Sequence, residues 1–297
     1  MIYINPNSDK IISARKYHVE ELIKLLTNRA GRLRINANQI KFLKENILVR
    51  IEEILGANPN ELMLLQGEFQ LDAPQRQAVE RLFNYSDWFC EKKDNRYNAY
   101  DLANKLDINT CVYCNRNYTS TVAGITRPQF DHYFSKERFP LLALSFYNLI
   151  PSCSICNSTI KGKKELFLDQ HLHPYLDNSI KDFRFSYYYN SKSKDDLSIN
   201  IVQHSNNIKA ENTFDFFKIK EVYNAHTDEL RDLIKIREAF SDKYLEILSS
   251  KVFRNGEISK SELYQLAFGA YFDDNKVSMR PFSKFKKDIL TELGIIK

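Results

Sequence analysis

The sequence predicts an α+β protein that is mostly helical, with a small mixed core inserted between N- and C-terminal helical regions. Apolar residues recur at helical spacing in the first hundred residues and again toward the C-terminus. Four of the five cysteines fall between these parts, and two segments of alternating apolar residues follow them. We therefore divide the chain into residues 1–107 (helical), 108–177 (core) and 178–297 (β-hairpin plus helices).

The first region is expected to hold four helices. HVEELIKLLTNRA places Val19, Leu22 and Leu26 on one face, and NQIKFLKENILVRIEEILG continues the 3.6-residue period. That second helix should end at Gly56, a residue suited to the left-handed position after a helix. DAPQRQAVERLFNYSDWF starts with Asp before Pro and predicts a third helix, and AYDLANKLD predicts a short fourth.

The third region should open with a β-hairpin, because FRFSYYY and LSINIV alternate on either side of a polar segment. EVYNAHTDELRDLIKIREAFSDKYLEILSSKV predicts one long amphipathic helix or a pair of helices. SKSE at residues 259–262 has the spacing of a capping box before LYQLAFGAYF. SKFKKDILTELGII predicts a final helix.

Composition favours a globular protein outside the membrane. Hydrophobic residues make up 43% and charged residues 27% of the chain. No apolar run approaches the roughly 18 residues of a membrane span, and the N-terminus lacks the apolar core of a signal peptide, so we expect a cytoplasmic protein. Residues 1–50 carry ten Lys or Arg against four Asp or Glu. This excess indicates either a polyanionic partner or a solvated helix face.

The cysteines predict a structural zinc site. Cys111 and Cys114 form one pair at two-residue spacing, and Cys153 and Cys156 form a second. Two such pairs supply the four thiolates of a closed tetrahedral site, which leaves no open position for chemistry. Four unligated core cysteines would leave the paired spacing unexplained. Cys90 stands alone among aromatic residues and is expected to be a small buried side chain.

The segment between the two pairs carries a recognisable set of polar residues. Asp131 and His132 adjoin in RPQFDHYFSKERFP, Asn148 precedes LIPSC, and Asn157 follows the fourth cysteine. This set, with its four-cysteine cage, resembles the HNH, or ββα-metal, endonuclease family over about a quarter of the chain. Many members of that family carry histidine where this chain has Asn157. An amide oxygen there still suits a hard cation such as Mg²⁺.

The resemblance implies a role for each residue. His132 would be the general base, since imidazole titrates near neutral pH. Asp131 and Asn157 would hold one Mg²⁺ or Mn²⁺ against the scissile phosphate. Asn148 would orient the loop that carries His132. The same positions also have structural interpretations: Asp131-His132 as a surface pair, Asn148 as a turn residue and Asn157 as a helix cap.

Further basic residues are secondary candidates. Lys161, Lys163 and Lys164 would either contact flanking phosphates or form a solvated helix end. His173, in HLHPYLD, would pack the end of the core or support the site without binding the metal directly, and His171 ranks below Asn157 as a ligand.

The flanking motifs look like one branch of the family. CVYCNRNY, DHYFSKERFP, NLIPSCSICNSTIKGKK and HPYLD resemble the HNH nuclease subunit of Septu-type anti-phage systems, including those attached to retrons. That likeness implies antiviral defence in a prokaryote and a separate ATPase partner. The chain has no G-x4-G-K-[ST] motif of its own.

The leading functional hypothesis is thus a metal-dependent nuclease acting on DNA. An RNase with the same site, cutting for example transfer RNA, is a second hypothesis, because such a site contacts the phosphodiester and not the base. A third is a zinc-bearing binding module whose nuclease residues are inert. A fourth gives the helical arms a DNA-reading role, for which NRAGRLR is the one candidate segment.

Overall fold

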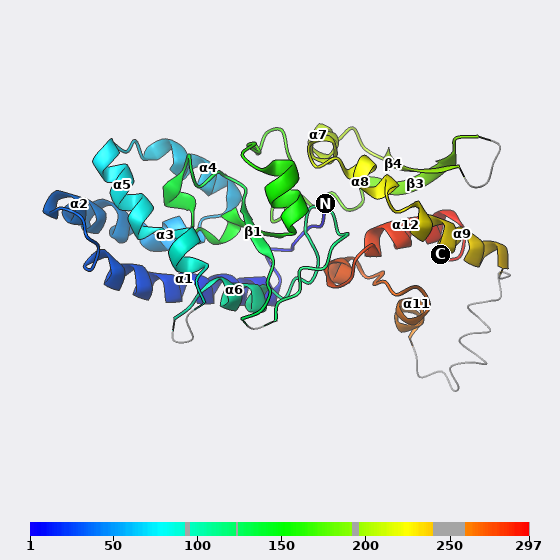
Figure 1. Cartoon of the computed structure of the whole chain (residues 1–297), viewed down its shortest axis with the longest axis horizontal. Coiled ribbons are helices and arrows are strands. Elements are labelled where there is room, and N and C mark those ends of the chain that lie inside the picture. Colours follow the sequence, from blue (N-terminus) through cyan, green and yellow to red (C-terminus); the bar gives the residue numbers. More distant parts are fainter. Residues whose placement is uncertain (93–95, 123, 192–195, 240–258, 297) are drawn as a thin grey trace. The chain divides into compact units, whose positions relative to one another are not determined.

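A computed structural model describes residues 1–92, 96–122, 124–191, 196–239 and 259–296 (Figure 1). The chain is α+β, with helices predominating and, within these ranges, two sheets of two strands each. It divides into two compact units. Unit 1 comprises Met1–Tyr3, Asn109–Tyr118 and Asn178–Lys297, and unit 2 comprises Ile4–Ile108 and Thr119–Asp177. The units therefore do not follow the three consecutive regions expected from the sequence.

The helices of unit 2 largely match the sequence prediction. They are α1 (Asp9–Ala30), then α2 (Ala37–Phe42), η1 (Leu43–Ile47), η2 (Leu48–Arg50) and α3 (Ile51–Gly56) without a break, then α4 (Pro59–Glu68), α5 (Ala73–Leu82), η3 (Tyr85–Phe89) and α6 (Ala99–Leu106). The prediction missed α4, although Asn58 and Glu61 form a capping box before and within it. Asp72 caps α5 as expected.

Two details of this region differ from expectation. Gly56 is the last residue of α3 and does not adopt the left-handed conformation. Its carbonyl accepts a hydrogen bond from the Arg15 guanidinium at 2.9 Å, which satisfies the helix end without a left-handed turn. Cys90 is only partly buried, because the preceding Phe89 occupies the core position at the end of η3.

The remaining elements of unit 2 form a strand–strand–helix sequence. β1 (Gln129–His132) pairs antiparallel with β2 (Leu149–Ser152), with His132 opposite Leu149. The short turns η4 (Pro140–Leu142) and η5 (Phe146–Asn148) lie between them, and η6 (Ile155–Lys161) follows. Gly162, at φ 53°, ends η6 in the left-handed region, and its N–H donates to the Asn157 carbonyl at 2.8 Å.

The N-terminal helices and this sheet share one core. The His18 side chain on α1 is fully buried, with Nε2 donating to the Leu144 carbonyl at 2.8 Å and Nδ1 accepting from the Tyr97 hydroxyl at 2.9 Å. The Ser145 hydroxyl donates to the carbonyl of Ile54 at the end of α3. These bonds fix the segment between β1 and β2 on the helices, so the helical region is part of the scaffold of the candidate site.

Unit 1 contains the second sheet and the C-terminal helices. β3 (Phe183–Tyr189) and β4 (Leu197–Gln203) form the predicted hairpin, and α7 (Ile208–Phe216), α8 (Ile219–Asn224), α9 (Thr227–Ala239), α11 (Lys260–Phe268), η8 (Asp274–Met279) and α12 (Ser283–Glu292) follow. The predicted long amphipathic segment is a helix pair as far as residue 239, and its remainder lies outside the described residues. Ser259 and Glu262 form the predicted capping box of α11.

The described part of the chain contains no helix with both the length and the apolar character needed to cross a bilayer.

Candidate functional site

The four paired cysteines form one buried cluster. The sulfur atoms of Cys111, Cys114, Cys153 and Cys156 all lie within 4.8 Å of one another. None of the chain's five cysteines, all within the described ranges, forms a disulfide bond. A zinc ion with four Zn–S bonds of 2.3 Å separates its sulfurs by about 3.8 Å. Four thiols at this spacing therefore fit a tetrahedral metal such as zinc after a small contraction.

Backbone hydrogen bonds shape both cysteine turns. The Cys111 carbonyl accepts from the Asn115 N–H at 2.8 Å, and its N–H donates to the Asn117 carbonyl at 3.0 Å. Asn115 takes a left-handed φ of 50°, and its side-chain amide donates to the Thr110 hydroxyl and to the Val277 carbonyl. In the second turn the Cys156 N–H points to the Cys153 sulfur at 3.5 Å. An N–H directed at sulfur stabilises the thiolate form that a metal requires.

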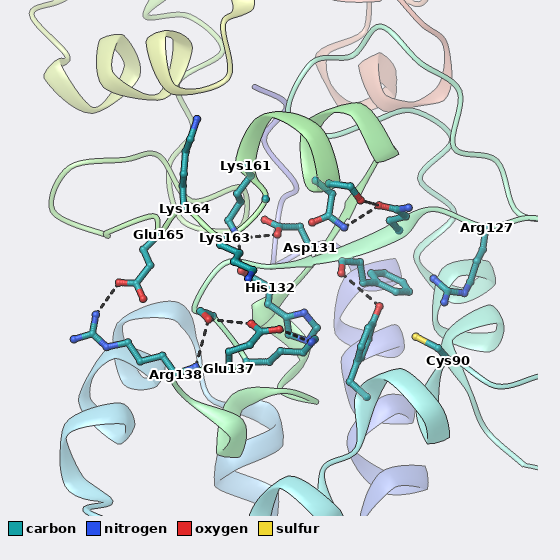
Figure 2. A pocket seen from close by; sticks show the side chains of 18 residues that line it. Cys90, Arg127, Asp131, His132, Glu137, Arg138, Lys161, Lys163, Lys164 and Glu165 are labelled. Carbon is teal, nitrogen blue, oxygen red and sulfur yellow. Dashed lines mark hydrogen bonds and ion pairs between the residues drawn. The ribbon is translucent and has the colours of Figure 1, made fainter.

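A cleft of about 840 Å³ lies over the end of β1 and beside η6. It is lined by Asp131, His132, Asn157, Lys161, Lys163 and Lys164 from the sequence prediction, and in addition by Tyr85, Cys90, Arg127, Gln129, Phe130, Ser135, Lys136, Glu137, Arg138, Ser158, Gly162 and Glu165. The Asp131 and Lys161 side chains point toward each other in this lining, whereas the His132 imidazole points away from them, toward Tyr85 (Figure 2). Six of these side chains are Lys or Arg and three are Asp or Glu, so the cleft has the charge balance that attracts a polyanion.

His132 is held in one tautomer. Its Nε2 donates to the Ala143 carbonyl at 2.9 Å, so the neutral ring carries its lone pair on Nδ1. The Tyr85 ring meets the imidazole edge-on with centroids 4.4 Å apart. Burial lowers the pKa of His132 to about 4, against the opposing effects of the Ala143 carbonyl and Asp131. The imidazole is therefore neutral, and available as a base, near pH 7.

Asp131 is paired with a buried lysine. The Lys161 ammonium donates to Asp131 Oδ1 at 2.8 Å and to the His132 carbonyl at 2.9 Å (Figure 2). Both side chains are more than 90% buried. The sequence predicts Lys161 either as a phosphate contact or as part of a solvated helix end; in the structure it is neither exposed nor solvated, and it links the end of η6 to the end of β1. Lys163 and Lys164 follow Gly162 and are exposed along the cleft.

Asn148 lies below the cleft and does not line it. Its side chain is fully buried; Oδ1 accepts from the Phe134 N–H at 2.7 Å, and Nδ2 donates to the carbonyls of Phe134 (3.0 Å) and Leu142 (2.8 Å). It thereby ties together both ends of the loop that follows His132. This is the kind of contact expected of a residue that orients the loop.

Asn157 lies at the start of η6 and lines the cleft. Its Nδ2 donates to Gln129 Oε1 at 2.9 Å, and the neighbouring Ser158 hydroxyl donates to the same oxygen at 3.0 Å. The strand pleat gives Gln129 and Asp131 the same face of β1, toward η6. A carboxylate and an amide oxygen thus line one cleft, and both are donor types that Mg²⁺ and Mn²⁺ prefer.

His171 and His173 lie away from the cleft lining. His173 is fully buried; its Nδ1 accepts from the Tyr175 N–H at 3.2 Å, and its ring packs on Tyr133 at 4.4 Å. Burial lowers its pKa to about 3. His171 Nδ1 accepts from the Phe167 N–H. His173 packs on Tyr133, the residue after His132, and thereby supports the end of β1.

The rim contains charged residues that the sequence did not single out. The Arg138 guanidinium pairs with Glu165 at 2.7 Å (Figure 2), and Glu137 accepts from the Lys136 ammonium at 2.6 Å. Burial raises the pKa of Glu137, but hydrogen bonds from Lys136, from the backbone and from Ser135, together with the Lys136 charge, outweigh burial and lower the pKa to about 2. No spacing rule predicted these residues, although Lys136, Glu137 and Arg138 lie within the quoted DHYFSKERFP motif.

Comparison with protein-family models, curated proteins and solved structures finds no match for this chain.

Proposed function

We propose that the chain is a metal-dependent nuclease of the HNH type that hydrolyses phosphodiester bonds, with DNA as the favoured substrate. The observation that supports this most is His132: its Nε2 is fixed by the Ala143 carbonyl, which leaves Nδ1 as a base in the same cleft as Asp131 and Asn157. The order β1, β2, η6, with a four-cysteine cluster at the start of η6, agrees with the resemblance on which the proposal rests.

The residues divide the chemistry among them. His132 Nδ1 takes the proton of a water molecule as that water attacks phosphorus, and the bond from phosphorus to the 3′ oxygen breaks. The leaving 3′ oxygen takes a proton from solvent water, so the products are a 5′-phosphate and a 3′-hydroxyl. Asp131 and Asn157 would hold a Mg²⁺ or Mn²⁺ ion, which would supply positive charge at the phosphate and the leaving oxygen. Exposed Lys163 and Lys164 bind neighbouring phosphates.

The cysteine cluster has a different part in this proposal. With zinc bound, its four thiolates fill the coordination sphere and leave no site for water. The cluster therefore shapes the start of η6, near Asn157, and takes no part in hydrolysis. An ATPase partner and a role in anti-phage defence follow from the resemblance alone, and co-purification from a native host is their direct test.

The nuclease proposal is tested with plasmid DNA and total RNA in Mg²⁺, Mn²⁺ or EDTA. Wild type should cut one polymer only with added divalent metal, and His132→Ala should lower the rate by a factor of roughly 10² or more. His204→Ala, at an exposed histidine of unit 1, is the matched control and should cut normally. Equal cutting by wild type and His132→Ala would overturn the assignment of His132. The polymer that is cut distinguishes DNase from RNase.

A further inference from the structure

Gln129 has no role in the chemistry above, yet it meets the start of η6. Its Oε1 accepts two hydrogen bonds, from Asn157 Nδ2 at 2.9 Å and from the Ser158 hydroxyl at 3.0 Å. Its own backbone is fixed as the first residue of β1, opposite Ser152, whose hydroxyl donates to the Gln129 carbonyl at 3.2 Å. The acceptor oxygen is therefore carried by an ordered strand end.

This contact decides which end of the Asn157 amide is available. An amide side chain has one oxygen acceptor and one NH₂ donor, which are nearly equal in shape and opposite in chemistry. Gln129 turns Oε1 toward η6, where it accepts from both Asn157 Nδ2 and the Ser158 hydroxyl, and this arrangement pairs with the Asn157 orientation that has Nδ2 toward Gln129. No described residue donates a hydrogen bond to Asn157 Oδ1, which leaves that oxygen to the cleft. In the flipped orientation an NH₂ group would face a cation there.

We propose that Gln129 is a positioning residue for Asn157, selecting the amide orientation that offers Oδ1 to a divalent cation. The inference rests on the proposed function, because it assumes that Asn157 is a metal ligand. It adds a residue that touches neither the ion nor the substrate and that acts only through the Asn157 amide. Ser158 shares the acceptor but has no amide to orient.

The substitution Asn157→Asp removes the dependence on amide orientation. A carboxylate has two equivalent oxygens, so its metal affinity does not depend on which of them faces the cleft. Gln129→Met removes the acceptor at nearly constant side-chain length. If Gln129 acts by orienting the amide, Gln129→Met should weaken metal binding when residue 157 is asparagine and not when it is aspartate. A general distortion of β1 would weaken binding equally in both backgrounds.

The experiment measures Mn²⁺ binding to the zinc-loaded chain by electron paramagnetic resonance, without nucleic acid. Wild type, Gln129→Met, Asn157→Asp, the double variant and Asn157→Ala are compared, with Ser158→Ala as the matched control. We expect Gln129→Met to weaken Mn²⁺ binding about tenfold, as loss of a partner that orients a ligand does. The double variant should match Asn157→Asp, and Ser158→Ala should match wild type.

The experiment distinguishes failure of the Gln129 role from failure of the proposed metal site. Unchanged Mn²⁺ affinity in Gln129→Met, or an equal loss in the asparagine and aspartate backgrounds, overturns the role of Gln129 and leaves the nuclease proposal standing. If Asn157→Ala binds Mn²⁺ as well as wild type, or if wild type binds none, Asn157 is not a ligand. The proposed metal site then fails, and the role of Gln129 fails with it.

Discussion

The cysteine cluster and the cleft both gather polar side chains from distant stretches of sequence, but they are built in opposite ways. The cluster holds four buried sulfurs, all of one kind, within 4.8 Å of one another. The cleft holds donors of different kinds, and each has a neighbour: Asp131 pairs with Lys161, and Asn157 with Gln129. The first can enclose an ion completely, whereas the second leaves room for substrate. A closed metal site depends on its ligands alone. An open site depends also on the neighbouring residues that hold those ligands in place.

The strongest test of this contrast removes the closed site. Cys153→Ser with Cys156→Ser should abolish stoichiometric zinc and cost on the order of several kcal/mol of unfolding free energy, because metal binding is coupled to folding. Zinc content by mass spectrometry and thermal unfolding measure both effects. Cys90→Ser, at the partly buried cysteine outside the cluster, should keep its zinc and its stability. A double variant as stable as wild type would show that the cluster is not a structural metal site.

The second test separates charge compensation from chemistry within the cleft. Lys161→Met leaves the Asp131 carboxylate buried without its ammonium partner, which should cost about 3–5 kcal/mol. Asp131→Asn leaves the opposite charge buried and should also be costly. The double variant buries no charge and should recover most of the stability in urea denaturation, whereas cleavage should stay lost. Strictly additive losses would show that the two groups stabilise the fold independently.

The contrast between the cluster and the cleft also explains which features could be predicted from the sequence. The 3.6-residue period, the capping boxes and the strand alternation are local signals, and they predicted most elements, including α11 and the hairpin. Two-residue cysteine spacing predicted the cluster because one ligand type at fixed spacing has few other uses. The division into units could not be read this way, because burial of His18 against Leu144 joins segments 126 residues apart.

The candidate site was predictable in its chemical groups and not in their partners. The Asp131-His132 pair and Asn157 line one cleft, as a resemblance to a strand–strand–helix nuclease implies. The sequence did not predict the burial of Lys161, because a lysine at the end of a helix is usually solvated. Gln129 was missed for a related reason. A glutamine at the edge of a strand has no motif, and its role appears only once its hydrogen bonds are known.

A weaker effect concerns the buried histidines. Burial lowers the pKa of His18 to about 4 and of His173 to about 3, so the folded state keeps both rings neutral. The unfolded chain binds their protons below about pH 6.5, so stability is full above that pH and falls as the solution becomes more acidic. Each ring should cost roughly 2 kcal/mol at pH 5.

Urea denaturation at pH 7 and pH 5 measures this loss. His18→Gln, which can still bond to Tyr97 and Leu144, should reduce the difference between the two pH values. An unfolding free energy that is the same at both pH values, in wild type and in His18→Gln, would show that these rings are protonated without cost in the fold.

The smallest expected effect on stability lies at the rim, where the cleft differs most from the cluster. Arg138 and Glu165 form an ion pair at 2.7 Å, but their side chains are 59% and 30% exposed, so Glu165→Gln should change stability by less than about 1 kcal/mol. Glu165→Gln should nevertheless tighten nucleic-acid binding, because it frees the guanidinium and removes a negative charge from the cleft.

The opposite variant, Arg138→Gln, should weaken nucleic-acid binding and lower its salt dependence by about one phosphate contact. Both are measured by fluorescence anisotropy in EDTA in a His132→Ala background, which prevents cutting. Equal affinities in the two rim variants would place the nucleic acid elsewhere on the chain.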